Sequence, residues 1–220
     1  MRPRAHEPRR GPMSPATAPP AMTREERLVL GLAGLAAVVA FLDGPGVAVG
    51  GASVAFSAGR VVTTALPAME RDLGGGLATQ QWAVDAYLIT LGALILLAGS
   101  LSDAYGRLLV MRIGLIGFGV TSVAIAAAPS PLVMIIARIL QGVAGALLVP
   151  SSLALIMSTF RDRAASARAI GIWTAMTTIA LIAGPLMGGL FVDFASWRYA
   201  FLVNVLPIAI TLVLIARLGH

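Results

Sequence analysis

The residue whose position most needs an explanation is Arg138, an arginine about six residues inside the apolar segment 132–158. Gln141, Gly142 and Gly145 follow it at offsets that place all four residues on one face of a helix. A charged side chain inside a membrane-spanning helix costs several kcal/mol unless it meets water or a partner. We interpret Arg138 as a functional, pathway-lining group; a purely structural role is the alternative.

Asp43 is the second ionisable candidate and directly follows the first apolar run, 28–42. Loss of water disfavours the charged form of a carboxylate, so an embedded carboxylate can bind and release a proton at ordinary pH. We expect Asp43 to be a proton-binding residue.

A stripe of polar and small residues lies along the segment 81–103. Asp85, Gly92, Gly99 and Asp103 are spaced so that they fall within about 40° of one another around a helix. The glycines favour close helix packing. Asp85 is a candidate pathway-lining residue, and a position near the membrane interface is the alternative interpretation.

The stripe ends in a turn, in which Asp103 and Arg107 flank Gly106 between two apolar segments. In the simplest interpretation this is a polar loop whose Asp103 caps the next helix. Gly99 would allow a neighbouring helix to approach, and Gly106 would allow a turn too tight for a side chain. A topological loop alone does not require these two glycines.

A third group of special residues, Gly184, Pro185, Gly188 and Gly189, lies in the apolar segment "ALIAGPLMGGLF". Pro185 removes one backbone hydrogen bond, and Gly184 with Gly188 makes a small-residue face. We expect this helix to bend and to pack tightly here. Packing alone would account for the motif.

The composition excludes several classes of function. Of the 220 residues, 58% are hydrophobic and 12% are charged, which is typical of a membrane protein. There is no cysteine and no lysine, and the two histidines are His6 and His220 near the ends. Thiolate metal sites, phosphate-binding loops with Gly-Lys-Ser/Thr and Ser-His dyads within a span are therefore excluded. The arginines lie between apolar segments without interleaved aromatic residues, so we expect no nucleic-acid partner.

Six segments are long and apolar enough to predict membrane-spanning helices, in an all-α membrane protein that contacts the lipid bilayer. They are 28–42, 81–101, 108–128, 132–158, 165–191 and 197–218. The bundle therefore occupies residues 28–218. Residues 1–27, rich in Arg, Pro and Ala, are expected to be a disordered tail that ends in a charged helix start.

The arginines near the span ends predict the orientation. With the N-terminus inside, the tail, two loops and the C-terminus hold twelve arginines, whereas the outer loops hold Arg71 and Arg198, besides Arg60 at the end of the insertion at 45–60. Because arginines collect on the cytoplasmic side, we expect both termini to be cytoplasmic. The twelve are residues 2, 4, 9, 10, 24, 27, 107, 112, 161, 163, 168 and 217.

Together, these motifs resemble the major facilitator superfamily. "GSLSDAYGR" is similar to its loop signature Gly-x-Leu-x-Asp-x-x-Gly-Arg, carried by Gly99, Leu101, Asp103, Gly106 and Arg107. "RILQG" resembles the fourth-helix motif, "GPLMGG" the fifth-helix antiporter motif, and "WRYAFLVNVLP" the start of the sixth helix in the fourteen-helix drug-proton antiporters. The four motifs occur in the family's order and helices.

The resemblance implies an N-terminal half of this fold, a six-helix bundle with three-plus-three inverted repeats. It implies export of drugs or other hydrophobic or cationic small molecules from the cell across its plasma membrane, driven by a proton gradient without a cofactor. Arg138 and Asp43 would take part in proton coupling, and the Asp103 turn would act as a gate. Asn204 in the sixth-helix motif is a further candidate pathway-lining residue.

The sequence also departs from the family pattern. Leu108 stands where a second basic residue usually follows Arg107. The first-helix motif is divided into "FLDG" and "VVTTALP" by an atypical Gly/Ala-rich insertion at 45–60, with Thr63 in place of an asparagine. An additional span through this insertion would reverse the orientation of the tail, which argues against it.

Six helices are half or fewer of the family's twelve or fourteen. The bundle would therefore need a C-terminal half, a second copy or a partner chain to transport a substrate by alternating access. The alternative is a membrane protein without transport activity, either a truncated remnant or a six-helix subunit that binds a partner chain. The DNA downstream of His220 would distinguish the two.

Overall fold

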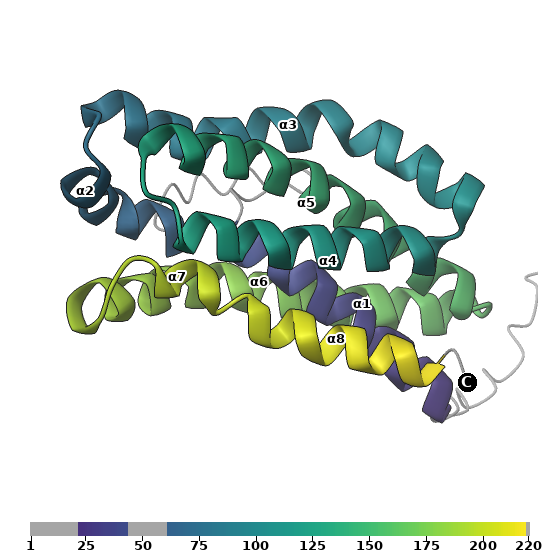
Figure 1. Ribbon diagram of the computed structural model, residues 1–220. Coiled ribbons are helices and arrows are strands. Elements are labelled where there is room, and N and C mark those ends of the chain that lie inside the picture. The colour runs from purple at the N-terminus through teal and green to yellow at the C-terminus, as the bar shows by residue number, and fades with distance from the viewer. Residues whose placement is uncertain (1–21, 44–60, 219–220) are drawn as a thin grey trace, which may run out of the picture.

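The structure is a computed structural model that describes residues 22–43 and 61–218. These residues form an elongated bundle of α-helices (Figure 1). The helices are α1 (Arg24–Asp43), α2 (Val61–Leu73), α3 (Gly76–Tyr105), α4 (Arg107–Ala126), α5 (Pro131–Thr159), α6 (Arg163–Phe194), α7 (Tyr199–Leu202) and α8 (Val205–Leu218).

Within the described residues, five segments are helical, long and apolar enough to cross a membrane. They are α3, α4, α5, α6 and the segment Tyr199–Arg217, which comprises α7 and most of α8. These five segments match the second to sixth predicted spans, and α3 begins five residues before the predicted boundary. The fold is all-α and of the membrane class, as the apolar runs predict.

Helix α1 occupies the position of the first predicted span but is less apolar. Its first turn carries Arg24, Glu25, Glu26 and Arg27, so fifteen apolar residues remain from 28 to 42. At 1.5 Å per residue they cover about 22 Å, less than the ~30 Å hydrocarbon core. The charged start is capped by Thr23, whose hydroxyl accepts from the Glu26 backbone N–H at 3.2 Å while the Glu26 carboxylate accepts from the Thr23 N–H at 2.8 Å.

Helix α2 is a separate helix of 13 residues that packs against α6 and α3. It begins with the "VVTTALP" half of the divided motif and contains Pro67. Its length of about 20 Å is too short to span a bilayer. The insertion at 45–60 lies outside the described residues.

The sixth predicted span is interrupted. Residues Val203 and Asn204 form a turn between α7 and α8, and the Asn204 N–H donates to the Phe201 carbonyl three residues back, at 3.2 Å. The apolar pattern predicts one continuous helix here, because hydropathy does not detect a local change of hydrogen-bond register.

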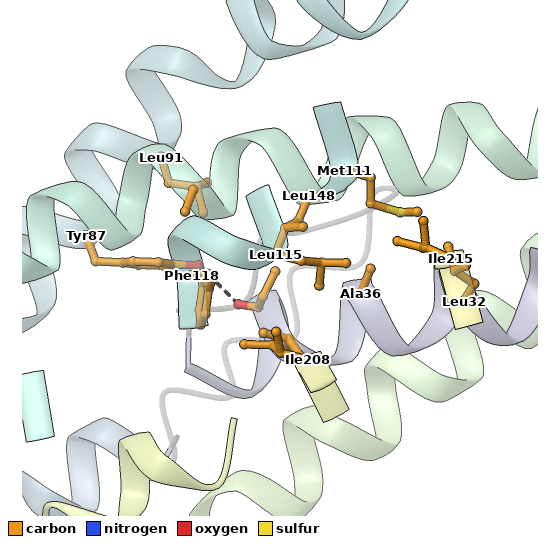
Figure 2. Close-up of a cluster of buried hydrophobic side chains, with 13 residues drawn as sticks. Leu32, Ala36, Tyr87, Leu91, Met111, Leu115, Phe118, Leu148, Ile208 and Ile215 are labelled. Carbon is orange, nitrogen blue, oxygen red and sulfur yellow. Dashed lines mark hydrogen bonds between the residues drawn. The ribbon is translucent and has the colours of Figure 1, made fainter. Parts of the chain in front are cut away.

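Helix α5 lies at the centre of the described bundle and packs against α3, α4 and α1. The largest core cluster joins α1, α3, α4, α5 and α8, and Figure 2 shows its side chains pointing into the space between these helices. Large apolar side chains also cover the outer surfaces, for example Leu96 and Phe194, which are 86% and 84% exposed. Such surfaces suit contact with lipid or with another bundle.

The two ends of the bundle carry different charge. The α3–α4 turn, the start of α1 and the end of α8 lie together at one end (Figure 1). The start of α1 and the α5–α6 loop also line a common pocket there. The opposite end holds the α2–α3 and α4–α5 connections. In the described chain the first end carries arginines 24, 27, 107, 112, 161, 163, 168 and 217, and the opposite end carries 71 and 198.

Candidate functional site: a buried arginine network

Arg138 is the largest fully buried side chain of the described residues, with 1% of its surface exposed. Its Nε donates to the Ala83 carbonyl of α3 at 2.6 Å, and its Nη1 donates to Gln141 Oε1 at 2.8 Å. The guanidinium is therefore held by a backbone carbonyl and a neutral amide, which replace water as its hydrogen-bond acceptors.

Gln141 extends the network to a third helix. Its Nε2 donates to the Ser122 hydroxyl of α4 at 2.9 Å, and both residues are completely buried. Because Arg138 and Gln141 are three residues apart on α5, one helix turn presents both groups in the same direction. The hydrogen bonds from Arg138 through Gln141 to Ser122 thus join α5 to α4, and the bond from Arg138 to the Ala83 carbonyl joins α5 to α3.

Two aromatic rings lie beside the guanidinium. Its central carbon is 4.7 Å from the ring centre of Tyr87 and 5.8 Å from that of Phe201, distances at which a cation is attracted to an aromatic face. The Tyr87 hydroxyl donates to the Ala40 carbonyl of α1 at 3.1 Å, the bond drawn as a dashed line in Figure 2. The arginine therefore lies where α1, α3, α4, α5 and α7 meet.

Gly142 and Gly145 allow this close assembly. A Cβ added to Gly142 would lie 2.6 Å from the Tyr87 carbonyl oxygen, and one added to Gly145 would lie 2.8 Å from the Tyr87 hydroxyl. The backbone of α5 thus touches α3 directly on the face that carries Arg138. Gly142 and Gly145 thus allow α5 to lie close enough to α3 for Arg138 to reach its partners there.

Asp43 is the last residue of α1, and the position of its side chain lies outside what the structure describes. Its expected proton-binding role stays a prediction.

The predicted stripe on α3 faces away from this network. Asp85, Gly92 and Asp103 are exposed in the described bundle, and Gly99 is partly exposed. A Cβ on Gly99 would meet only Pro150 Cβ, at an ordinary contact distance of 4.0 Å. Among the described residues, α5 is thus the neighbour of Gly99, at a distance that would also accommodate a small side chain. Asp85 lines an open face of the bundle.

The turn after the stripe has the backbone expected for it. Gly106 has a φ of 95°, which favours glycine, and links α3 to α4 directly. The expected capping by Asp103 is not found, because Gly106 occupies the N-cap position of α4 and no side chain caps it. Asp103 instead forms an exposed pair with Arg107, with 3.7 Å between Oδ1 and Nη2. Leu101 is partly buried one turn earlier.

The "GPLMGG" motif lies within α6, which continues as one helix from Arg163 to Phe194. Gly184 and Gly188 are buried, as expected for a packing face, whereas a Cβ on Gly189 would meet open space. The side chain of Pro185 lies outside the described set.

Asn204, proposed from the sequence as a pathway-lining residue, is buried to 99%, with 1% of its surface exposed. Neither its Oδ1 nor its Nδ2 has a hydrogen-bond partner among the described residues. An unsatisfied buried amide is costly, so its position needs a reason beyond packing.

A second polar cluster, which the sequence reasoning missed, closes the opposite end of the bundle. Asp72, near the end of α2, accepts through Oδ2 from Trp197 Nε1 at 3.0 Å and from Arg198 Nη2 at 2.8 Å. Arg198 also donates through Nη1 to the carbonyls of Ala126 and Ala128 at 2.7 and 3.2 Å. We call Asp72, Trp197 and Arg198 the end clamp.

The hydrogen bond from Trp197, followed by that from Arg198, holds the pKa of Asp72 below its ordinary value of 3.8. Asp72 lies outside the five spans, and its ion pair with Arg198 is about half exposed. The charged form of Asp72 is thus favoured by contacts that exist only in the folded bundle. No group of three or more potential metal ligands occurs in the part of the chain that the structure describes.

Long apolar helices packed around a buried, hydrogen-bonded arginine define a multi-pass helical membrane protein. The family model described as Major Facilitator Superfamily matches residues 47–219. The chain belongs to the Major Facilitator Superfamily.

Curated relatives carry names that refer to resistance and efflux. The chain is 39% identical over 160 residues to the puromycin resistance protein pur8 of Streptomyces alboniger, covering 73% of this chain and 32% of that protein. It is 39% identical over 159 residues to the tetracenomycin C resistance and export protein of Streptomyces glaucescens, with 72% and 29% covered. The multidrug efflux pump LfrA of Mycolicibacterium smegmatis is 41% identical over 155 residues, with 70% and 31% covered. The matched part of this chain thus spans about a third of each relative.

Proposed function

We propose that the chain acts as the N-terminal half of a proton-coupled exporter of drugs or other hydrophobic or cationic small molecules. The observation that carries the proposal is the buried network of Arg138, inside a bundle whose relatives are named for antibiotic resistance, export and efflux. Those names describe the relatives, and the activity of this chain is inferred from its similarity to them.

In this mechanism Arg138 is the fixed cation of the coupling site. Its bonds to Ala83 and Gln141 hold its guanidinium in place in the buried interior of the bundle. A carboxylate near such a cation is attracted to the cation while it is ionised, and it loses this attraction when it binds a proton, because only the ionised form makes an ion pair. We assign the role of this carboxylate to Asp43. Export of the substrate would follow the release of the proton from Asp43.

The arginine-rich end of the bundle is proposed to face the cytoplasm, with the chain in the plasma membrane and both termini inside. The turn with Asp103 and Arg107 lies at this end, where we assign it a gating role against a second bundle. The open face that carries Asp85, Gly92 and Gly99 supports the presence of such a bundle. A C-terminal half, a second copy or a separate chain could supply it.

The experiment measures proton-driven transport of ethidium by inverted membrane vesicles that carry the protein. Arg138→Ala is expected to abolish transport while the protein stays in the membrane, and the exposed Arg217→Ala serves as the control. Ethidium transport unchanged by Arg138→Ala would overturn the assignment. Asp43→Asn should remove the pH dependence of transport, and a pH profile that survives would place the proton elsewhere.

The second candidate is a six-helix subunit or remnant without transport activity. The matched part covers 29–32% of the three relatives above, so the activity of a whole relative is a proposal for this chain. The reading frame downstream of His220 separates the candidates: further spanning helices support the exporter, and a stop codon supports the subunit or remnant.

A further inference from the structure

Asn204 differs from most buried polar side chains of the described spans, and it shares the lack of a hydrogen-bond partner with Ser102 Oγ and Trp173 Nε1. The hydroxyls of Thr121, Ser151 and Thr211, for example, donate to carbonyls of their own helices. The amide of Asn204 offers two donor hydrogens and an acceptor oxygen, and neither atom is bonded to a described residue. It lies at the interruption between α7 and α8, one turn after Phe201, whose ring faces the Arg138 guanidinium.

The contacts between α4 and the sixth span place Asn204 at the depth of Ser122. A Cβ on Gly119 would lie 3.5 Å from Ile208, while Arg198 bonds the Ala126 carbonyl, so the two segments run antiparallel. The contact between Gly119 and Ile208 gives a common reference level. Ser122 lies three residues after Gly119, about 4.5 Å from that level along α4. Asn204 lies four residues before Ile208, about 6 Å from that level, and because the segments are antiparallel it lies on the same side. The two side chains are therefore nearly level across the same interface.

Ser122 has hydrogen-bonding capacity left on that interface. Its hydroxyl accepts from Gln141 Nε2, but it donates to none of the described residues. A buried hydroxyl and a buried amide at the same depth thus each lack a bond that the other could form. Gln141 is at present the only side chain bonded to Ser122 in the described chain.

We propose that Asn204 is a positioning residue of the Arg138 network, whose amide oxygen accepts from the unused Ser122 hydroxyl hydrogen in a second arrangement. In the observed arrangement Ser122 is bonded to Gln141 alone among the described side chains, and in the second it is bonded to Gln141 and Asn204. The added bond orients the Ser122 hydroxyl and, through it, the Gln141 amide that contacts Arg138, so the surroundings of the arginine differ in the two arrangements. The role in export rests on the proposed function, whereas the pairing of Ser122 with Asn204 does not.

The first experiment tests the pairing and uses the absence of cysteine from the sequence. Ser122→Cys with Asn204→Cys is expected to form a disulfide on mild oxidation of the purified chain, because a disulfide requires Cα atoms within about 7 Å. Ser122→Cys with Thr211→Cys is the control and should not cross-link, since Thr211 lies seven residues further along the same segment. Failure of the first pair to cross-link would overturn the proposal.

The second experiment tests whether the amide is unbonded in the observed arrangement. Asn204→Leu removes the unsatisfied group and keeps the same branched shape, so the melting temperature of the purified chain is expected to rise by about 2–4 °C. Thr211→Val, which removes a hydroxyl bonded to the Pro207 carbonyl, should not raise it. A fall in melting temperature for Asn204→Leu would show that the amide already makes stabilising bonds, which contradicts the proposal.

The third experiment measures ethidium transport by inverted vesicles across a range of pH. Asn204→Leu and Ser122→Ala are each expected to slow transport about tenfold and to shift its pH of half-maximal rate, and the double variant should lose no more. Transport at the wild-type rate and pH, or losses that multiply in the double variant, would overturn the positioning role. If the wild-type chain transports nothing, the proposed function fails, while the cross-linking result still decides the pairing.

Discussion

The carboxylate of Asp72 and the guanidinium of Arg198 are joined at 2.8 Å, although 126 residues separate them in the sequence. Trp197 donates to the same carboxylate oxygen, and Arg198 binds the carbonyls at the end of α4. The end clamp thus ties α2, α4 and the sixth span together at one end of the bundle. The buried arginine network ties α3, α4 and α5 together in its interior.

Asp72→Asn is expected to lower the stability of the chain at neutral pH, by about 1 kcal/mol or less because the ion pair is half exposed. Folding lowers the pKa of Asp72 below 3.8, so its contribution is present above that value and is lost as the pH falls through the folded-state pKa. The melting temperatures of wild type and variant should therefore differ at pH 7 and converge below about pH 3.8. The exposed Asp193→Asn is the control, and a difference independent of pH would contradict the prediction.

Gly142→Ala should destabilise the bundle by about 1–3 kcal/mol, because the added methyl group would lie 2.6 Å from the Tyr87 carbonyl oxygen and force α3 and α5 apart. Gly92→Ala is the matched control on α3, where the new Cβ meets open space and the helix gains about 0.5–1 kcal/mol. Thermal unfolding of the two variants is expected to shift in opposite directions. Equal shifts would mean that the contact at Gly142 does not limit helix packing.

Gln141→Leu should cost about 1–3 kcal/mol, since it removes an acceptor from Arg138 and the donor to Ser122 inside the bundle. The exposed Gln81→Leu tests whether the loss of any glutamine has this effect. Chemical denaturation of both variants measures the difference. A Gln141 variant as stable as the Gln81 variant would show that the network contributes no net stability.

Gly106→Ala should destabilise the α3–α4 turn by about 1 kcal/mol, because a φ of 95° strains any residue with a Cβ. Gly171→Ala places the same methyl group in the middle of α6, where nothing lies within 4 Å, and should be neutral or stabilising. The two melting temperatures give the comparison. A stable Gly106 variant would indicate that the turn can adopt another backbone conformation.

The parts of this fold that can be predicted from sequence are those set by neighbours along the chain. Runs of apolar residues predict the five long spans, and the spacing of Arg138 and Gln141 places both on one face. The turn at Gly106 also follows from local residue types. In each case the determining residues lie within a few turns of one another.

What could not be predicted depends on contacts between distant segments. Asp72 and Arg198 appear in the sequence as ordinary loop charges, and nothing local indicates that they pair. Tyr87 is one aromatic residue in a long apolar run, and only the packing of α3 on α5 brings it beside Arg138. The interruption at Asn204 is likewise invisible to hydropathy, since the segment around it is apolar throughout.

The end clamp has a consequence for biosynthesis. Arg198 follows Ala128 by 70 residues, so α4 leaves the ribosome well before the side chain that binds its last carbonyls. At about 5–20 residues per second, that interval is roughly 4–14 s. During this time the end of α4 must rely on water or on other proteins for its hydrogen bonds. Final closure of the bundle therefore waits for translation of its sixth span.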